Sequence, residues 1–189
     1  LENLKNICRR LKTCGSKAPA TVRARVAARY LRGQGIEIGA LHQPLPLPPG
    51  VSVRYVDRMD EAGLREHYPE LAEGPLVTVD VIDDGERLAS FDDGSLDFVI
   101  ANHFLEHCEN PIGAIEHFLR VLRPGGRIYL AVPDMRRTFD AVREPTGFEH
   151  LLRDYRDGPE GSRRSHYEEW IRVVHNVEDD EWAENRIRY

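Results

Sequence analysis

Several features that mark other classes of protein are scarce in this sequence. No apolar run approaches the roughly 18 residues that a membrane-spanning helix needs, and no secretory signal peptide is visible. The 189 residues include only three cysteines, an odd number that suits a reducing compartment. A chain of this length can bury one hydrophobic core. We therefore expect one cytoplasmic domain overall, with no membrane span.

Two further absences bear on cofactors. The G-x-G-x-x-G fingerprint of dinucleotide-binding enzymes does not occur, which disfavours an oxidoreductase of that type. Cys8 and Cys14 could pair or hold a metal, but the five residues between them are not a common zinc spacing. We therefore expect no metal site.

Acidic residues are almost missing from the first 32 positions, which hold nine Lys or Arg and one Glu, whereas the remainder holds 17 basic and 31 acidic residues. Such asymmetry is found in arms that bind nucleic acid, anionic lipid or an acidic partner. It also fits basic helices that pack on an acidic body of the same chain. We favour the second interpretation, so a nucleic-acid partner remains open but is not favoured.

The apolar pattern predicts alternating strands and helices. We expect strands at 36–39, 51–56, 76–81, 96–101 and 127–132, a helix at 61–67, and a helix that Asn110 caps. Ile112, Ile115, Leu119 and Leu122 should form the core face of the capped helix. Thr21 should cap an earlier helix, whose apolar stripe is Val22, Val26, Ala27, Tyr30 and Leu31.

This order of elements predicts an α/β fold with a Rossmann-like, mostly parallel sheet of at least five strands flanked by helices. We divide the chain into basic N-terminal helices (1–32), a cofactor-binding core (33–134) and a helical cap on the acceptor side (135–189). The cap is highly charged and shows no convincing strand after residue 132.

The stretch from Gly35 to Pro44 reads as a buried strand that ends in a glycine turn, and Asp57 ends the next strand. A glycine at a strand tip lets the backbone approach a ligand, and a neighbouring carboxylate can accept hydrogen bonds from ribose hydroxyls. The pattern therefore favours an adenosine cofactor.

Five segments in a fixed order strengthen this hypothesis. They are Glu37-Ile38-Gly39, Tyr55-Val56-Asp57, the run from Phe91 to Val99, Leu105-Glu106-His107, and the run from Leu122 to Arg127. In residues 33–134, this set resembles the class I S-adenosylmethionine-dependent methyltransferases, the group often labelled methyltransferase type 11. The resemblance implies S-adenosylmethionine as cofactor and methyl transfer to an unidentified small-molecule or glycan-type acceptor.

The resemblance also implies a cofactor site along the strand tips. Its expected residues are Glu37, Gly39, Ala40, Leu41, Asp57, Asp83, Asp84, Gly85 and Asn102. Asp84 is our preferred partner for the adenine amine, and His103 is the candidate general base. Each has a plainer alternative: a strand carboxylate bonded to backbone, a strand-end cap, a solvated turn, or a loop histidine bonded to backbone.

Two departures from the family pattern stand out. Gly39 is followed by Ala40-Leu41-His42, so the second glycine of the usual acid-x-glycine-x-glycine cofactor loop is missing, and the final two strands of the family sheet are not evident. We expect either a shortened chain or a sheet that something else completes. These departures keep open a second function, a catalytically silent cofactor-binding or interaction module.

His103-x-x-Glu106-His107 also spells the inverted zinc-peptidase pattern. It follows a buried strand directly and leaves only about one helical turn before Asn110-Pro111, so we disfavour a hydrolase. The cap offers polar groups that should shape the acceptor site, namely Asp134, Arg136, Arg137, His150, Asp154, Tyr155, Arg163, Arg164 and His166.

Overall fold

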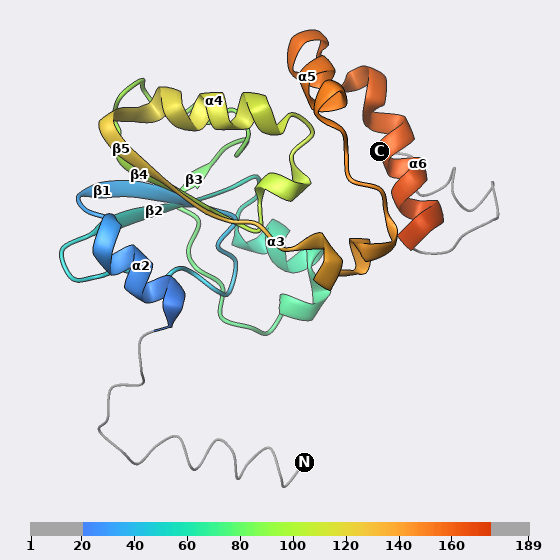
Figure 1. Ribbon diagram of the computed structural model, residues 1–189. Helices are drawn as coiled ribbons and strands as arrows, with labels where there is room; N and C mark the ends of the chain where they lie inside the picture. The colour runs from blue at the N-terminus through green and yellow to red at the C-terminus, as the bar shows by residue number, and fades with distance from the viewer. Residues whose placement is uncertain (1–20, 175–189) are drawn as a thin grey trace, which may run out of the picture.

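The computed structural model describes residues 21–174. Its centre is a sheet of five parallel strands in the order β3-β2-β1-β4-β5 (Figure 1). The strands are β1 (Gln34–Ile38), β2 (Ser52–Asp57), β3 (Val81–Ile82), β4 (Leu96–Asn102) and β5 (Leu122–Ala131). The helices predicted within residues 1–20 and 178–188, and the pair Cys8 and Cys14, lie outside the described residues.

Helices cover both faces of the sheet, with α4 (Pro111–Val121) on one side and α2 (Val22–Tyr30) on the other (Figure 1). α3 (Glu61–His67) and the 3-10 turn η1 (Pro69–Leu71) follow β2, and η2 (Leu105–His107) follows β4. Thr21 caps α2 by accepting a hydrogen bond from the Ala24 N–H at 3.1 Å. In the same way Asn110 caps α4 through the Gly113 N–H at 2.9 Å. Both predicted caps are confirmed.

Side chains on the two faces of β4 belong to two separate hydrophobic core clusters. Phe98 and Ile100 pack with α2, whereas Val99 and Ala101 pack on the side of α4 and Phe118. Alternate residues of a strand point to opposite faces, so a strand covered on both faces must be apolar throughout. The nearly continuous apolar run at 96–101 therefore predicted a central strand correctly.

After β5 the chain is helical as far as it is described. The elements are η3 (Met135–Arg137), η4 (Phe139–Val142), α5 (Phe148–Asp157) and α6 (Glu160–Val174). Polar contacts join α5 and α6 to the region of α4: Arg163 pairs with Glu109 at 2.6 Å, and the Tyr155 hydroxyl donates to Glu116 at 3.1 Å. Within residues 21–174 no strand follows β5, as expected.

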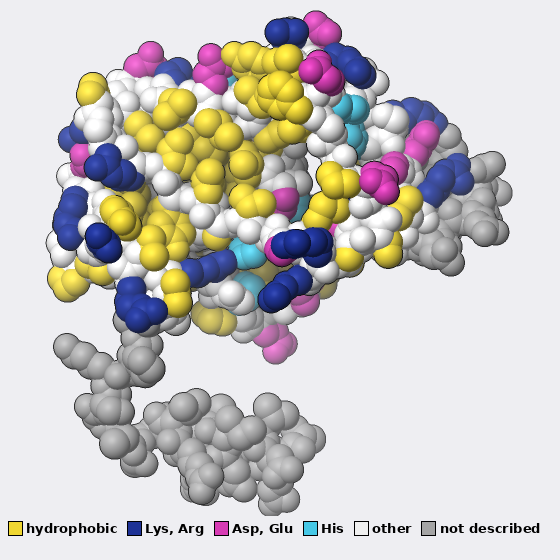
Figure 2. All heavy atoms as spheres, in the orientation of Figure 1, with side chains coloured by type: hydrophobic (Ala, Val, Ile, Leu, Met, Phe, Trp, Pro, Cys, Tyr) yellow, Lys and Arg dark blue, Asp and Glu magenta, His cyan; other side chains and the backbone are white. Residues whose placement is uncertain are grey.

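β5 forms one edge of the sheet. Its end carries exposed apolar side chains, with Leu130 40% and Val132 54% exposed. Figure 2 shows hydrophobic side chains gathered on this face of the molecule. In the described part of the chain, no helix is long and apolar enough to cross a membrane.

Four details of the sequence prediction were wrong. The fifth strand begins at Leu122 and not at Arg127, so Leu122 lies in β5 and not on the core face of α4. The third strand covers only Val81–Ile82, because the N–H groups of Val77 and Asp80 bond to Leu41 in the loop after β1 and to Tyr55 in β2 without forming a ladder. In α4 the buried side is Ala114, Phe118 and Val121, whereas Leu119 is 60% exposed. In α2 only Ala27 is buried, with Leu31 just beyond its end, and the other stripe residues are at least 38% exposed.

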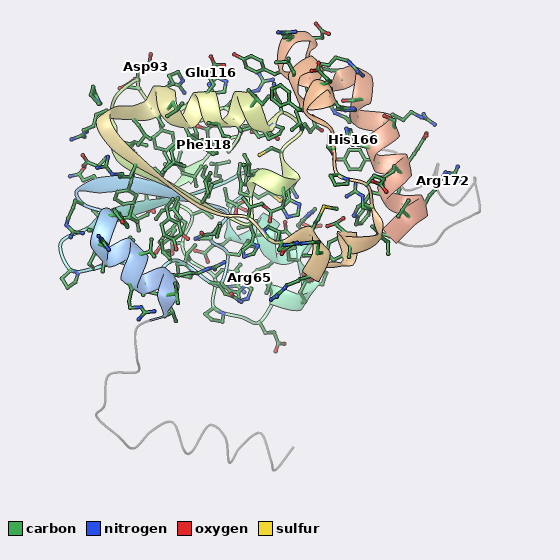
Figure 3. The ribbon with its side chains drawn as sticks, in the orientation of Figure 1. Arg65, Asp93, Glu116, Phe118, His166 and Arg172 are labelled. Atoms are coloured by element: carbon green, nitrogen blue, oxygen red, sulfur yellow. The ribbon has the colours of Figure 1, made fainter. Side chains whose placement is uncertain are left out.

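The error in α4 has a simple cause. Two apolar stripes run along this helix, and periodicity alone does not tell which of them faces the sheet. The larger side chain, Phe118, is the one that packs inward, while Glu116 lies on the outer side (Figure 3).

Candidate functional site

The strand order places a candidate site at the carboxyl ends of β1 and β4. Connections from β1 run to β2 and β3 on one side, and β4 and β5 lie on the other, so the direction of winding reverses between β1 and β4. In open parallel sheets, ligands bind in the crevice at this reversal point. The predicted residues around Gly39 and Asn102 follow these two strands.

Gly39 begins the loop after β1 with open space around it. Its N–H donates to the Val56 carbonyl at 2.9 Å, and its φ of +63° is one that glycine adopts easily. A Cβ added there would meet no atom within 4 Å. The space beside the Gly39 backbone is therefore open, and its role in holding a cofactor stays a prediction.

Two residues at this edge hold an unusual backbone conformation. Leu41 after β1 has φ +49° and His103 after β4 has φ +50°, both in the left-handed region that side chains disfavour. Such conformations gather at functional sites because the surrounding structure must hold them. Their positions flank the reversal point of the sheet.

Glu37 is a buried carboxylate in the middle of this arrangement, only 1% exposed. Both of its oxygens accept from the Leu45 N–H at 3.0 Å, and Oε1 accepts from the Asn102 side-chain amide at 3.2 Å. Burial raises the pKa of Glu37, and the hydrogen bonds from Leu45 and Asn102 oppose that rise. Glu37 thus ties the loop after β1 to the tip of β4.

The bond to Glu37 fixes the amide of Asn102. Its Nδ2 is used, while its buried Oδ1 has no hydrogen-bond partner among the described residues. A buried acceptor without a donor costs about 1–3 kcal/mol. Such an atom at the carboxyl edge suits a ligand that brings an N–H group.

Asp57 ends β2 beside Gly39. Its Oδ1 accepts from the Arg58 N–H at 2.8 Å, which is a strand-end contact of the plainer kind. Burial raises the pKa of Asp57, and the neighbouring Arg58 and Met59 groups oppose the rise. The half-buried carboxylate keeps further acceptor positions for a ligand hydroxyl.

The two aspartates after β3 differ in how their oxygens are used. Asp83 accepts from the Asp84 and Ser90 N–H groups, both at 2.8 Å, and so holds the turn. Asp84 is more exposed, accepts from the Glu86 N–H at 2.9 Å and pairs with Arg87 at 3.5 Å. Gly85 is buried, and a Cβ there would meet Ile38 at 2.6 Å and Phe104 at 2.7 Å. This close packing explains the glycine.

His103 makes two side-chain contacts at the same edge. Its Nε2 lies 2.7 Å from the guanidinium of Arg23 in α2, and its Nδ1 lies 3.4 Å from Glu106. An arginine only donates, so Nε2 carries the lone pair and Nδ1 carries the proton. No local sequence pattern pointed to Arg23, which is 80 positions away from His103.

Most predicted cap residues are engaged elsewhere. Arg136 pairs with Asp134 at 2.7 Å, and Arg163 and Arg164 pair with Glu109 and Glu168. A cavity of about 570 Å³ lies between the 84–89 turn, α4 and α6. Its lining includes Asp84 but omits Gly39, Asn102 and His103.

An open parallel sheet that reverses beside its first strand, with a glycine loop and acids at its strand tips, is a Rossmann-like nucleotide-binding fold. Residues 33–130, just over half of the chain, match the family described as Methyltransferase domain. The chain belongs to this family, and its sheet has the Rossmann-like arrangement of the class I S-adenosylmethionine-dependent methyltransferases.

Solved structures of methyltransferases share parts of this fold. One from Aquifex aeolicus is 14% identical, with 67% of this chain and 73% of that chain covered and a TM-score of 0.42. One from Methanosarcina mazei is 27% identical, with 54% of each chain covered and a TM-score of 0.39. The trans-methyltransferase CalH, solved with S-adenosylhomocysteine, is 15% identical, with 55% and 34% covered and a TM-score of 0.37.

The match spans about half of the Methanosarcina protein and about a third of CalH. No curated protein matched the chain.

Proposed function

We propose that this protein transfers a methyl group from S-adenosylmethionine to a small-molecule or glycan-type acceptor at the carboxyl edge of its sheet. The observation that carries the proposal is the unpartnered Oδ1 of Asn102, buried between β1 and β4 beside the open backbone of Gly39. An acceptor atom and an accessible glycine at the reversal point of the sheet suit a ligand that offers an ammonium and a ribose.

Different residues would bind different parts of such a cofactor. Asn102 Oδ1 would accept from the amino group of the methionine moiety, and Asp57 would accept from the ribose hydroxyls. Asp84 would receive the adenine amine, because its carboxylate is more exposed than that of Asp83, whose two oxygens accept from N–H groups of the turn. Glu37 acts as a positioning residue, because it holds the Asn102 amide and the loop with Ala40 and Leu41.

S-adenosylmethionine supplies a methyl group already activated on a sulfonium. The chain's part is to orient the acceptor in line with the departing sulfur and to exclude water. His103 is our candidate for the proton of a hydroxyl acceptor, since its Nε2 holds the lone pair. Arg23 occupies that lone pair, so an acceptor hydroxyl would have to displace it.

The first test is calorimetric titration of the full chain with S-adenosylhomocysteine, with NAD as the control ligand. We expect micromolar affinity for the former and none for NAD. Asp57→Ala should weaken binding at least tenfold through loss of the ribose contact, whereas Asp92→Ala, in an exposed turn, should not. Unchanged affinity in Asp57→Ala would contradict this site map.

A silent cofactor-binding module is the second candidate, and the missing second loop glycine, at whose position Leu41 stands, favours it. Turnover assays with hydroxyl, amine and carboxylate acceptors, including sugars, separate the two functions. Methyl transfer that is lost in His103→Ala supports the proposed base. Tight product binding without any turnover would favour the module.

A further inference from the structure

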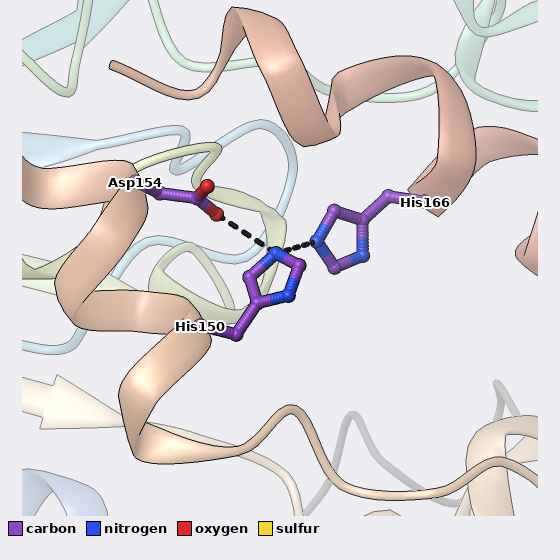
Figure 4. A group of neighbouring side chains, drawn as sticks. All are labelled: His150, Asp154 and His166. Carbon is purple, nitrogen blue, oxygen red and sulfur yellow. Dashed lines mark hydrogen bonds and ion pairs between the residues drawn. The ribbon is translucent and has the colours of Figure 1, made fainter. Parts of the chain in front are cut away.

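Three metal-ligating side chains meet where α5 packs against α6. His150 and Asp154 lie one turn apart on α5, and His166 reaches toward them from α6 (Figure 4). The Nε2 atom of His150 lies 2.8 Å from Nε2 of His166 and 3.1 Å from Oδ2 of Asp154. All three ligand atoms lie within 4.8 Å of one another.

Hydrogen bonds alone do not satisfy all three of these side chains. An imidazole nitrogen has one in-plane position, which holds either a proton or a lone pair. Nε2 of His150 faces both the other imidazole nitrogen and a carboxylate oxygen. If it carries a proton, two acceptors share that proton; if it carries a lone pair, it faces the Asp154 oxygen with no proton between them. A single cation among the three atoms would satisfy all of them.

The surroundings of Asp154 resemble the support that metal ligands receive. Its side chain is 5% exposed, and its second oxygen, Oδ1, accepts from the Ser162 hydroxyl at 2.8 Å. A carboxylate whose outer oxygen is fixed in this way presents the other oxygen in one direction. The cluster is therefore a supported set of ligands drawn from two helices.

We propose that His150, Asp154 and His166 bind a divalent transition metal of the zinc type that joins α5 to α6. Two imidazoles and a carboxylate suit zinc and its neighbours better than magnesium. Ligand atoms of a tetrahedral zinc site lie about 3.3 Å apart, given bonds of about 2.0–2.1 Å. The two observed contacts of His150, 2.8 Å and 3.1 Å, are slightly shorter than this, and the third pair, His166 and Asp154, lies within 4.8 Å, so the side chains would have to shift to enclose a cation.

A cavity of about 360 Å³ adjoins the cluster and is lined by His150, Asp154, Asp157 and Ser165 among others. It leaves room for water as a fourth ligand. The proposal goes beyond the sequence expectation of no metal site, and it does not rest on methyl transfer. The geometry also separates this cluster from His103 and His107, because His103 contacts Arg23 and Glu106 instead.

The test begins with the full chain stripped of metal by a chelator. We expect Zn²⁺ to bind with one-to-one stoichiometry in a calorimetric titration, and Mg²⁺ not to bind. Co²⁺ should give the visible absorption of a nitrogen- and oxygen-ligated site. Hydrogen exchange should show Zn²⁺-dependent protection of α5 and α6 and no change in β4.

Single substitutions test which residues bind the metal. His150→Ala and His166→Ala should each weaken Zn²⁺ binding at least about 100-fold, and Ser162→Ala about 10-fold, as expected for a residue that supports a ligand. His107→Ala is the matched control and should bind Zn²⁺ as the parent does, since it removes a histidine from the rival pattern. Circular dichroism checks that each variant folds.

Some outcomes would overturn the proposal. One is the absence of Zn²⁺ uptake by the parent chain, which would mean that a proton rather than a metal bridges the two histidines. Another is affinity that falls in His107→Ala but not in His166→Ala. If a variant fails to fold, exchange protection confined to α5 and α6 of the parent still decides the matter, because protection elsewhere contradicts the site.

Discussion

The sheet core and the helical region after β5 bury different kinds of residue. Phe98, Val99, Ile100 and Ala101 of β4 are fully buried, and the α4 side chain of Phe118 is too. Over residues 135–174, the described residues that are buried are Asp154 and Ile171. One region thus rests on apolar area and the other on polar contacts.

This difference indicates which kind of contact stabilises each region against unfolding. Each Å² of apolar surface removed from water contributes about 25 cal/mol, so the core gains from its many buried side chains. The region after β5 depends on contacts such as Arg143 with Glu169 at 2.5 Å and with Asp140 at 2.8 Å. Partly exposed ion pairs contribute little each. We therefore expect α5 and α6 to open more easily than the sheet.

The largest effect should come from the core. Phe118→Ala removes a fully buried ring that packs against the β-sheet and Phe104, so it should lower the free energy of unfolding by about 3–5 kcal/mol. Denaturant unfolding followed by far-UV circular dichroism measures this loss.

The neighbouring residue provides the control. Leu119 is 60% exposed, and Leu119→Ala should change stability by no more than about 0.5 kcal/mol. The sequence pattern assigned Leu119 to the core face of the helix, so this pair decides directly between the pattern and the structure. Equal losses in the two variants would contradict the packing of α4.

A smaller effect is expected where the helices after β5 are held by charge. Arg143→Ala leaves the carboxylates of Glu169 and Asp140 without this donor and should lower the free energy of opening of α6 by about 1–2 kcal/mol. Native-state hydrogen exchange measures it amide by amide.

Arg156→Ala, an exposed position on α5, is the matched control and should leave the exchange of α6 unchanged. The amides of β4 should exchange alike in both variants and in the parent. Faster exchange in β4 of Arg143→Ala would show that the two regions unfold together, and the comparison between them would fail.

The same contrast governs what could be predicted from the sequence. The apolar run of β4, the cap at Asn110 and the glycine at the end of β1 are local signals, and each predicted its element correctly. The strand tips then assembled at one edge because parallel strands end together. The roles of Asp57, Asn102 and His103 stay predictions, because a local sequence pattern does not show which residues contact a cofactor.

Contacts between separate elements could not be predicted from the sequence. Nothing in the pattern joins Arg23 to His103, or Leu45 to Glu37. His150 and Asp154 stand four apart, which is a usable helical signal, but His166 joins them only through the packing of α6 on α5. Charged helices offer many such pairs, and tertiary packing selects among them.

The smallest effect concerns a polar group inside the apolar region. Burial raises the pKa of Glu37 above its ordinary value of 4.5, so the folded chain holds a proton that the unfolded chain has already released. Its contribution to stability is present at low pH and is lost as pH rises through the folded pKa. Glu37→Gln does not titrate and still offers an oxygen to the Leu45 N–H.

The stability of Glu37→Gln relative to the parent should therefore increase as pH rises from about 4.5 through the raised pKa, and then level off. Denaturant midpoints across this range measure the difference, with Glu66→Gln on the exposed side of α3 as the matched surface control. A difference that instead shrinks with rising pH would mean that the hydrogen bonds from Leu45 and Asn102 outweigh burial. The Glu37 carboxylate would then stabilise the fold through polar contacts, as the ion pairs after β5 do. The contrast between an apolar sheet core and a polar region after β5 would not apply to the candidate site.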